Sequence, residues 1–195
     1  MKRKELFLNI EGILKANMFK KKGEVWNRTT NEIYKWVIDF QKGKSASKDK
    51  FDMTVNVGVY MSGTKKLLFN IESDFAIGPD CFFRARPRFF GLSHEWWDFD
   101  LNIDNSSQIT EIESLLNEKI FPFLNNNKNY DSLISFLPIE KWEKNSNFHS
   151  ELLRVGVGYY IVGNIDRARA TLQIVLDGGT IWTKKAQDVL NLIKH

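Results

Sequence analysis

One eleven-residue stretch constrains the fold more than any other part of the sequence, because every second side chain in it is apolar. The apolar members are Phe51, Met53, Val55, Val57, Val59 and Met61. The residues between them are Asp52, Thr54, Asn56, Gly58 and Tyr60. Since successive side chains of a β-strand point to opposite faces, this pattern predicts a long strand with one face in a core. The chain must therefore contain a sheet.

Shorter segments with strand character lie on both sides of this strand. We expect them at 25–30, 33–41, 67–71, 81–90 and 97–103. The connections between them are short, which favours an antiparallel meander of about five strands. Pro87 lies inside one of these segments and indicates an edge strand or a bulge there.

Helical periodicity appears before and after the strands. A first amphipathic helix is expected over 3–18, with Gly23 after three lysines as a stop signal. A second helix begins at Ser106 or Ser107 and runs to about 124, where Pro122 is expected to bend or end it. The remaining expected helices are 131–137, 149–162, 165–177 and 181–193.

The polar run at 125–129 is the best domain boundary in the chain. It separates an expected sheet domain, 1–125, from an expected helical hairpin unit, 130–195. The predicted fold class is α+β, in which an antiparallel sheet of about five strands is flanked by helices and followed by the hairpin.

The net charge of +4 is unevenly distributed. Residues 1–70 carry 15 Lys and Arg against 7 Asp and Glu, whereas residues 71–148 carry 7 against 13. A basic first third suits an acidic partner, nucleic acid or anionic lipid. The alternative is a solvated, lysine-coated sheet edge that resists aggregation.

The sequence favours a cytoplasmic protein. No apolar run is long enough for a transmembrane helix, and Glu5, Asn9 and Glu11 interrupt any signal-peptide core. Cys81 is the only cysteine, which rules out an internal disulfide and favours a reducing compartment. We expect no membrane partner.

Several short blocks in order resemble a known family. They are Phe19–Arg28, Val55–Val59, Cys81–Arg86 and Trp96–Asp98. Together they resemble a bacterial domain-of-unknown-function family, number 4304, over roughly residues 5–125. The resemblance implies no settled activity, but it suggests immunity or accessory proteins near bacterial toxin genes. Where relatives are expected to carry a histidine near Cys81, this chain has Phe82 and Phe83, so no function of that histidine is expected.

The C-terminal segment resembles half of a tetratricopeptide array. The residues that carry the resemblance are Gly156, Tyr159, Gly163, Ala168 and Leu172, at the spacing of that repeat's packing positions. One repeat cannot bury its face alone. The hairpin therefore either packs on or caps the sheet domain, or forms a groove for a partner peptide.

Arg84, Arg86 and Arg88 are the most suggestive cluster of charged side chains. On a strand they would share one face, spaced by about 7 Å. Guanidinium groups suit carboxylates and phosphates, so the cluster predicts an anionic ligand or an acidic patch on a partner. The alternative is that Asp98 and Asp100 on a neighbouring strand neutralise the arginines.

Other candidate residues give weaker signals. His94, Trp96 and Trp97 lie near the arginines and are included in the candidate binding site, and Cys81 with His94 is a formal nucleophile pair. The mixture of Trp26 and Trp36 with lysines suits single-stranded nucleic acid, although the acidic middle of the chain disfavours it. His94, His149 and His195 are too scattered to predict a metal site.

The sequence contains no strong catalytic motif, so no catalytic residue, metal or cofactor is predicted. The favoured function is a protein-binding module of the immunity type that blocks a toxin. Its expected contact surfaces are the segment that carries Arg84, Arg86 and Arg88, which we call the arginine segment, and the lysine-rich loop 42–50. The alternative is an enzyme or small-ligand binder with an anion site at the arginine segment.

Overall fold

A computed structural model describes residues 3–30, 33–43, 49–73 and 75–193, and these form two compact units. The sheet unit, as we call it, comprises Met1–Val59, Ala76–Pro79 and Arg84–Asn126. The helical unit comprises Tyr60–Phe75, Asp80–Phe83 and Asn127–His195. The chain thus passes between the units several times before its last crossing at Asn126.

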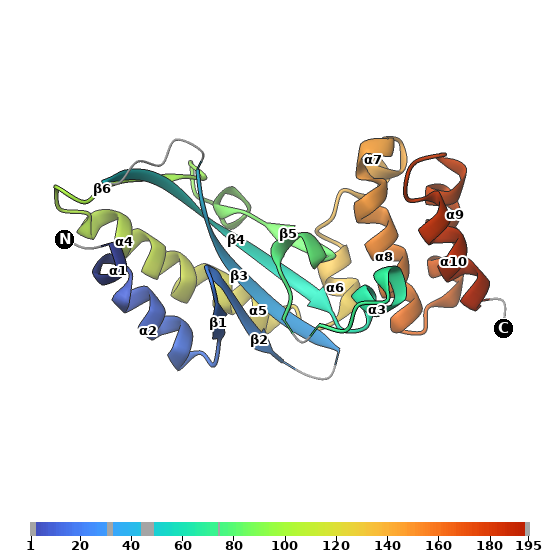
Figure 1. Ribbon diagram of the computed structural model, residues 1–195, viewed down its shortest axis with the longest axis horizontal. Coiled ribbons are helices and arrows are strands. Elements are labelled where there is room, and N and C mark those ends of the chain that lie inside the picture. The colour runs from blue at the N-terminus through green and yellow to red at the C-terminus, as the bar shows by residue number, and fades with distance from the viewer. Residues whose placement is uncertain (1–2, 31–32, 44–48, 74, 194–195) are drawn as a thin grey trace. The chain divides into compact units, whose positions relative to one another are not determined.

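Six strands of the described residues form one sheet (Figure 1). Its order is β1-β2-β3-β4-β5, with β6 also pairing with β4. The pairs β1–β2, β2–β3 and β4–β6 are antiparallel, and the predicted α+β class is confirmed. The strands are β1 (Lys20–Lys22), β2 (Val25–Thr29), β3 (Tyr34–Lys42), β4 (Lys50–Met61), β5 (Phe83–Ala85) and β6 (Trp97–Asp100).

The alternation that opened the sequence analysis is confirmed in β4. Phe51, Met53 and Val55 are all buried, whereas Asp52 and Asn56 on the opposite face are half-buried. Towards its end the strand becomes buried on both faces, because Gly58 and Tyr60 are also inaccessible. The hydrophobic pattern of this strand therefore fixes the side on which the core of the sheet unit lies.

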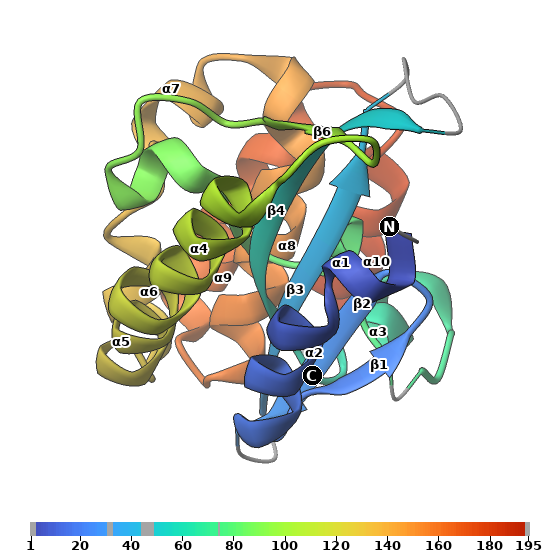
Figure 2. The ribbon, with the colours of Figure 1, turned by 90° about the vertical axis from the view of Figure 1, so that its left-hand side faces the viewer.

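Helices of the sheet unit cover the core side of the sheet (Figure 2). The helices are α1 (Arg3–Leu6), α2 (Leu8–Ala16), α4 (Ser106–Ser114) and α5 (Phe121–Asn126), with a π-helical segment, Leu115–Ile120, between the last two. The ring of Phe7 lies 5.5 Å from Phe99, which stacks at 5.1 Å on Phe51. These rings join the N-terminal segment to β4 and β6.

The predicted single helix over 3–18 is wrong in two respects. It is interrupted at Phe7, and α2 ends at Ala16 with Met18 in the left-handed region at φ 62°. Lys20–Lys22 then forms β1, because the positive φ of Gly23 turns the chain back on itself and lets the lysines pair with β2. Asn31, a residue type that favours a turn between the first two expected strands, lies outside the described residues.

Two strand predictions failed where short apolar runs were ambiguous. The segment predicted as a strand over 67–71 lies largely in helix α3 (Thr64–Phe69), whose Leu68 is buried among side chains of the helical unit. The strand predicted over 81–90 is confined to β5, because Pro87 begins a 3-10 turn, Pro87–Phe90. Two further 3-10 turns are Gly78–Asp80 and Ser146–Phe148.

The helix predicted to run to about 124, with Pro122 bending or ending it, continues to Asn126. The π-helical segment immediately before Pro122 provides the irregular backbone that a proline inside a helix requires. The helix is not capped by Ser106 or Ser107. Asp104 instead accepts hydrogen bonds from the backbone N–H of Ser106 at 2.9 Å and from its hydroxyl at 2.8 Å, and these bonds hold the pKa of Asp104 below its ordinary value.

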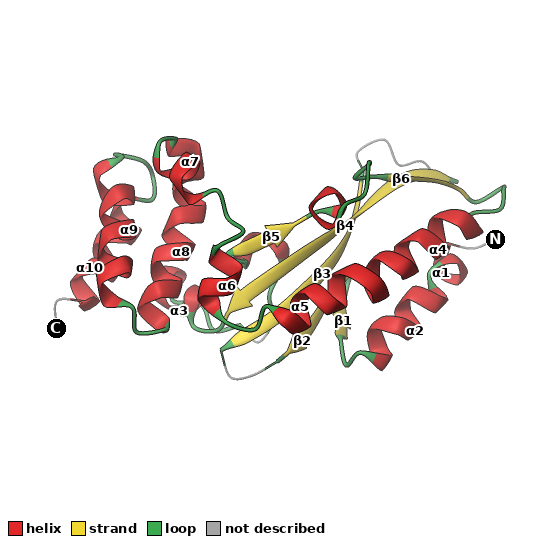
Figure 3. Cartoon of the chain, turned by 180° about the vertical axis from the view of Figure 1, so that it is seen from behind, coloured by secondary structure: helices red, strands yellow, loops and turns green. Residues whose placement is uncertain are grey.

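The helical unit contains a stack of three C-terminal helices (Figure 3). Its helices are α3, α6 (Tyr130–Ile134), α7 (Ile139–Glu143), α8 (His149–Ile161), α9 (Ile165–Asp177) and α10 (Thr183–Ile193). Gly156 of α8 lies where a Cβ atom would be 2.7 Å from Leu172 Cγ of α9. The absence of that side chain lets the two helices approach closely.

Candidate functional site

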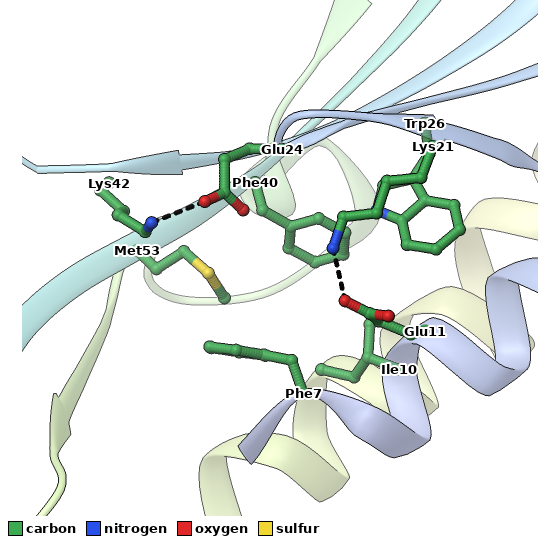
Figure 4. Close-up of a pocket in the computed structure, with 9 residues that line it drawn as sticks. All are labelled: Phe7, Ile10, Glu11, Lys21, Glu24, Trp26, Phe40, Lys42 and Met53. Atoms are coloured by element: carbon green, nitrogen blue, oxygen red, sulfur yellow. Dashed lines mark hydrogen bonds and ion pairs between the residues drawn. The ribbon is translucent and has the colours of Figure 1, made fainter. Parts of the chain in front are cut away.

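The sheet unit contains a pocket of about 320 Å³ between α2 and the core side of the sheet (Figure 4). Its apolar lining is Phe7, Ile10, Trp26, Phe40 and Met53. Its charged lining is Glu11, Lys21, Glu24 and Lys42. The pocket therefore combines an apolar, largely aromatic interior with four charged groups.

The period of two in the strands places these groups together. Glu24 and Trp26 alternate along the chain entering β2, and Phe40 and Lys42 alternate on β3, so each pair shares one face of the sheet. The β1–β2 register puts Lys21 directly opposite Trp26. This face of the sheet therefore carries the aromatic rings of Trp26 and Phe40, with charged residues at its edge.

The interruption between α1 and α2 shapes the opposite wall. Phe7 lies at the break, with its ring also 6.3 Å from Phe51, and Ile10 and Glu11 follow three and four residues later. Residues with this spacing lie on one face of a helix. The helical segment thus presents one aromatic, one aliphatic and one acidic side chain to the pocket.

Two ion pairs lie on opposite sides of the apolar side chains in Figure 4. Glu11 of α2 forms a close ion pair with Lys21 of β1, and the Lys21 ammonium lies 5.3 Å from the centre of the Trp26 ring. Glu24 pairs with Lys42 at 2.6 Å. Partly exposed pairs such as these contribute at most about 1 kcal/mol each, so their partners can be exchanged at little cost.

Charge near the pocket also affects the opposite face of β3. Burial raises the pKa of the Asp39 carboxyl above its ordinary value, and the negative charge of Glu24 raises it further. The Asn56 side-chain amide, which donates to Asp39 at 3.4 Å, opposes the rise. Asp39 is therefore a half-buried carboxyl whose protonated form is favoured in the folded protein.

The chemistry that the pocket offers follows from the residue types that line it. Among the described residues that line the pocket there is no His, Cys, Ser or Thr. Its carboxylates are already engaged by lysines, so none stands ready as a general base. What the arrangement offers chemically is burial for an apolar group and ion pairing for a charged group attached to it.

The predicted arginine face is divided by the local backbone. Arg84 lies in β5 and Arg86 follows in extended conformation, but Arg88 lies in the 3-10 turn. The three guanidinium groups therefore do not share a strand face. The strand carrying Asp98 and Asp100 is not a neighbour of β5, because β6 pairs with β4, so the predicted cross-strand neutralisation is wrong.

The arginine segment instead makes local contacts. Arg86 pairs with Glu95 at 3.3 Å, donates to Asn56 at 3.2 Å and lies 5.9 Å from the centre of the half-buried Trp96 ring. Asp100 pairs with Lys50 at 3.1 Å. Arg86 is thus held at the surface of the sheet unit, on the face opposite the pocket.

His94 and Trp97 meet at Glu111 of α4. The Trp97 indole N–H donates to the Glu111 carboxylate at 2.6 Å, and His94 Nε2 lies 3.3 Å from the same carboxylate. Trp97 is buried, so this group joins β6 to α4 and offers no open aromatic surface. Cys81, the other half of the formal nucleophile pair, is buried and belongs to the helical unit.

The aromatic residues that favour binding of single-stranded nucleic acid in the sequence are also buried. Trp26 and Trp36 are each 2% exposed, with Arg28 lying 4.7 Å from the Trp36 ring centre. Stacking of bases requires open ring faces, which these residues lack. Most of the lysine-rich loop, residues 44–48, and His195 lie outside the described residues.

Sequence reasoning grouped Lys21, Trp26 and Lys42 by composition but did not recognise a pocket. The available signal was the alternation of charged and aromatic residues on paired strands, which places Glu24 with Trp26 and Phe40 with Lys42. Nothing in the pattern indicates that the space above those side chains stays unfilled. That property depends on how α2 is held.

Two broader searches of the described residues gave negative results. No group of three or more His, Cys, Asp or Glu side chains is arranged to hold a metal ion. No described helix combines the length and apolar character needed to cross a membrane.

Comparison with known proteins gives one family match. A family model described as "Domain of unknown function (DUF4304)" matches residues 10–126, which is more than half of the chain and includes every pocket residue except Phe7. No curated protein and no solved structure matches the chain.

Proposed function

We propose that this chain, which belongs to the DUF4304 family, is a binding protein whose sheet unit takes a small molecule in the pocket beneath α2. The observation that supports this function is the roughly 320 Å³ hollow lined by five apolar side chains. Ligand sites are typically concave and apolar, with a few polar groups that orient the ligand.

The hollow is unusual for the interior against which it lies. Protein cores are close-packed, and an unfilled apolar space loses dispersion contacts. The surrounding side chains are well buried, with Ile10 at 1%, Trp26 at 2% and Met53 at 2% exposure. A ligand that covers these groups recovers contacts that the empty pocket lacks.

The test is ligand-observed NMR on the full chain with small molecules of benzene to indole size, covering neutral, anionic, cationic and zwitterionic classes. We expect saturable binding of at least one class. Ile10→Phe projects a ring into the pocket and should abolish that binding. Leu8→Phe places the same ring on an exposed position of α2 and should preserve it.

A second filling variant, Met53→Phe, guards against misfolding of the first. Loss of binding in both filled variants, with native circular dichroism spectra, assigns the ligand to this pocket. If no class binds, or if the filled variants bind as well as the parent chain, the proposed function is wrong.

A second candidate function is a protein-binding module, for which one surface feature argues. Phe89 is 41% exposed, and its ring lies 5.1 Å from Phe90 and 5.3 Å from Phe123. Arg88 precedes it in the same 3-10 turn. Aromatic and arginine side chains are the residues enriched at the energetic centres of protein interfaces.

On this second proposal the chain is a cytoplasmic, bacterial, immunity-type inhibitor whose target has an acidic surface. The tetratricopeptide-like hairpin α8–α9 would be its alternative contact surface. Affinity capture from host lysate with the parent chain, a Phe89→Ala/Arg88→Ala variant and an Ile103→Ala control tests the idea. A stoichiometric partner lost only in the double variant supports it, and capture of no partner counts against it.

A further inference from the structure

We propose that the ligand of the pocket beneath α2 is a hydrophobic zwitterion, an α-amino acid with a large apolar side chain, held between Glu11 and Lys21. This inference rests on the proposed function and specifies its ligand. It follows from the charge pattern of the pocket, from the positions of the two ion pairs and from the volume available.

The charges of the described lining residues are balanced. Two ammonium groups and two carboxylates line the pocket, and each is paired with a group of the opposite sign. A ligand with a single charge takes one member of a pair and leaves the other without its partner. A zwitterion takes both members at once, so that every charge stays paired.

Of the two pairs, Glu11–Lys21 is the better placed to bind the head group. The Glu11 side chain is 18% exposed, compared with 55% for Glu24, so a bond to Glu11 is better shielded from water. The Lys21 ammonium also lies 5.3 Å from the centre of the Trp26 ring, which lines the pocket. Glu11 would accept from the ligand ammonium and Lys21 would donate to the ligand carboxylate.

Other charged groups near Glu11 do not upset this assignment. The ammonium of Lys15 lies 3.8 Å from Glu11 and belongs to a side chain that is 67% exposed. It can remain beside Glu11 on the solvent side while the ligand ammonium approaches from the pocket.

The volume agrees with an amino acid of this class. A cavity of about 150 Å³ lined by apolar side chains holds one benzene molecule. The pocket has roughly twice that space, at about 320 Å³, and its interior carries the rings of Phe7, Trp26 and Phe40. An aromatic or branched aliphatic side chain would lie in this space against the half-buried ring of Phe7, with the head group at the ion pair.

The test is isothermal titration calorimetry of the full chain with four matched probes: l-phenylalanine, 3-phenylpropionate, phenethylamine and 2-phenylethanol. They share the phenyl group and differ in charge. Since hydrogen bonds to charged groups contribute about 1.5–3 kcal/mol, l-phenylalanine should bind at least about tenfold tighter than each analogue. l-Leucine and l-tryptophan serve as side-chain variants of the zwitterion.

Two substitutions separate the charges. Glu11→Gln should weaken l-phenylalanine and phenethylamine about tenfold, whereas 3-phenylpropionate should bind at least as tightly as before, because Lys21 no longer has to leave Glu11 unpaired. Lys21→Met should weaken l-phenylalanine and 3-phenylpropionate, whereas phenethylamine should bind at least as tightly as before for the corresponding reason. Glu24→Gln and Lys42→Met alter the second ion pair of the pocket and should weaken binding less than the first two substitutions do. The matched controls Glu72→Gln and Lys66→Met alter an exposed ion pair of the helical unit and should change these affinities less than twofold.

The outcomes distinguish this inference from the proposed function. If a singly charged or neutral analogue binds as tightly as the amino acids, the pocket is a ligand site but the zwitterion inference is overturned. If Glu24→Gln and Lys42→Met have the larger effects, the Glu11–Lys21 assignment is overturned. If no probe of any class binds, both the inference and the proposed function are wrong.

Discussion

The two units of this chain treat internal space in opposite ways. In the helical unit, Gly156, Gly158 and Gly178 lie where a side chain would collide with a neighbour, whereas the sheet unit keeps a hollow of about 320 Å³ beside buried aromatic rings. A Cβ atom on Gly158 would be 2.5 Å from the Tyr130 ring, and one on Gly178 would be 2.6 Å from His149 Nδ1. The helices of the helical unit therefore pack without free space at these glycines, whereas the sheet unit has free space beside its buried rings.

The two kinds of glycine make this comparison testable. Gly156, Gly158 and Gly178 face close neighbours within the helical unit. Gly12, in the middle of α2 in the sheet unit, has nothing within 4 Å of the position that a Cβ would occupy. The same substitution should therefore have opposite effects in the two units.

The largest effect is expected for Gly158→Ala. The new methyl group collides with the Tyr130 ring, whose hydroxyl donates to the Val155 carbonyl at 2.5 Å, so the ring cannot move without losing a buried hydrogen bond. Overpacking of this kind costs about 1–3 kcal/mol, and loss of the hydrogen bond adds about 1 kcal/mol. Urea unfolding should show the loss, and hydrogen exchange should locate it in the helical unit. An unchanged midpoint would show that the helical unit has more free space than these contacts imply.

Gly12→Ala should have the opposite sign. The position is exposed and helical, so the methyl group meets no obstacle and the unfolded chain loses conformational freedom. We expect stabilisation by about 0.5–1 kcal/mol in the same unfolding experiment. Destabilisation would mean that α2 does not tolerate side chains on its outer face.

Local pattern predicted much of this fold and little of the pocket. The alternation in β4 and the periodicity of α8, α9 and α10 were sufficient, because each segment is long and its pattern agrees with its final packing. Lys20–Lys22 has no intrinsic preference for a strand. It forms β1 because Gly23 permits a tight turn and β2 supplies the partner.

The candidate site depended on features that no local pattern records. The hollow depends on the break at Phe7 and on the register that sets Lys21 opposite Trp26. Alternation indicates which side chains share a face, but not whether another element fills the space above them. The prediction that Arg84, Arg86 and Arg88 share a strand face failed because Pro87 begins a 3-10 turn where the strand was expected to continue.

Met18→Gly examines the turn that connects the pocket's helix to its first strand. Met18 has φ 62°, a left-handed backbone conformation that is strained for a residue with a Cβ atom. Met18 is also 67% exposed, so packing of its side chain does little to offset that strain. Glycine relieves that strain but increases the freedom of the unfolded chain, leaving a net gain of about 0.5 kcal/mol. Met18→Ala retains the Cβ atom and should show no gain. Equal stability of the two variants would mean that the turn is not strained.

The smallest effect is expected for Asp39→Asn, and it depends on pH. Burial and the Glu24 charge raise the pKa of Asp39, so the folded protein holds that proton more tightly than the unfolded chain does. Stability is therefore greatest below the ordinary aspartate pKa and is lost as the pH rises towards the raised value, after which the penalty stays constant. Asparagine removes the charge while keeping an oxygen that can accept from Asn56.

The variant should accordingly be more stable than the parent chain at neutral pH, by less than about 0.5 kcal/mol because solvent screens a half-exposed carboxyl. The difference should vanish at about pH 3, below the ordinary aspartate pKa. Urea unfolding at the two pH values measures it, and repetition in a Glu24→Gln background should reduce the gain, since one source of the raised pKa is then gone. A variant that is less stable at neutral pH would show that the ionised Asp39 is held by its Asn56 contact more strongly than burial opposes it. A gain that stays the same in the Glu24→Gln background would show that the charge at the edge of the pocket has no influence on Asp39.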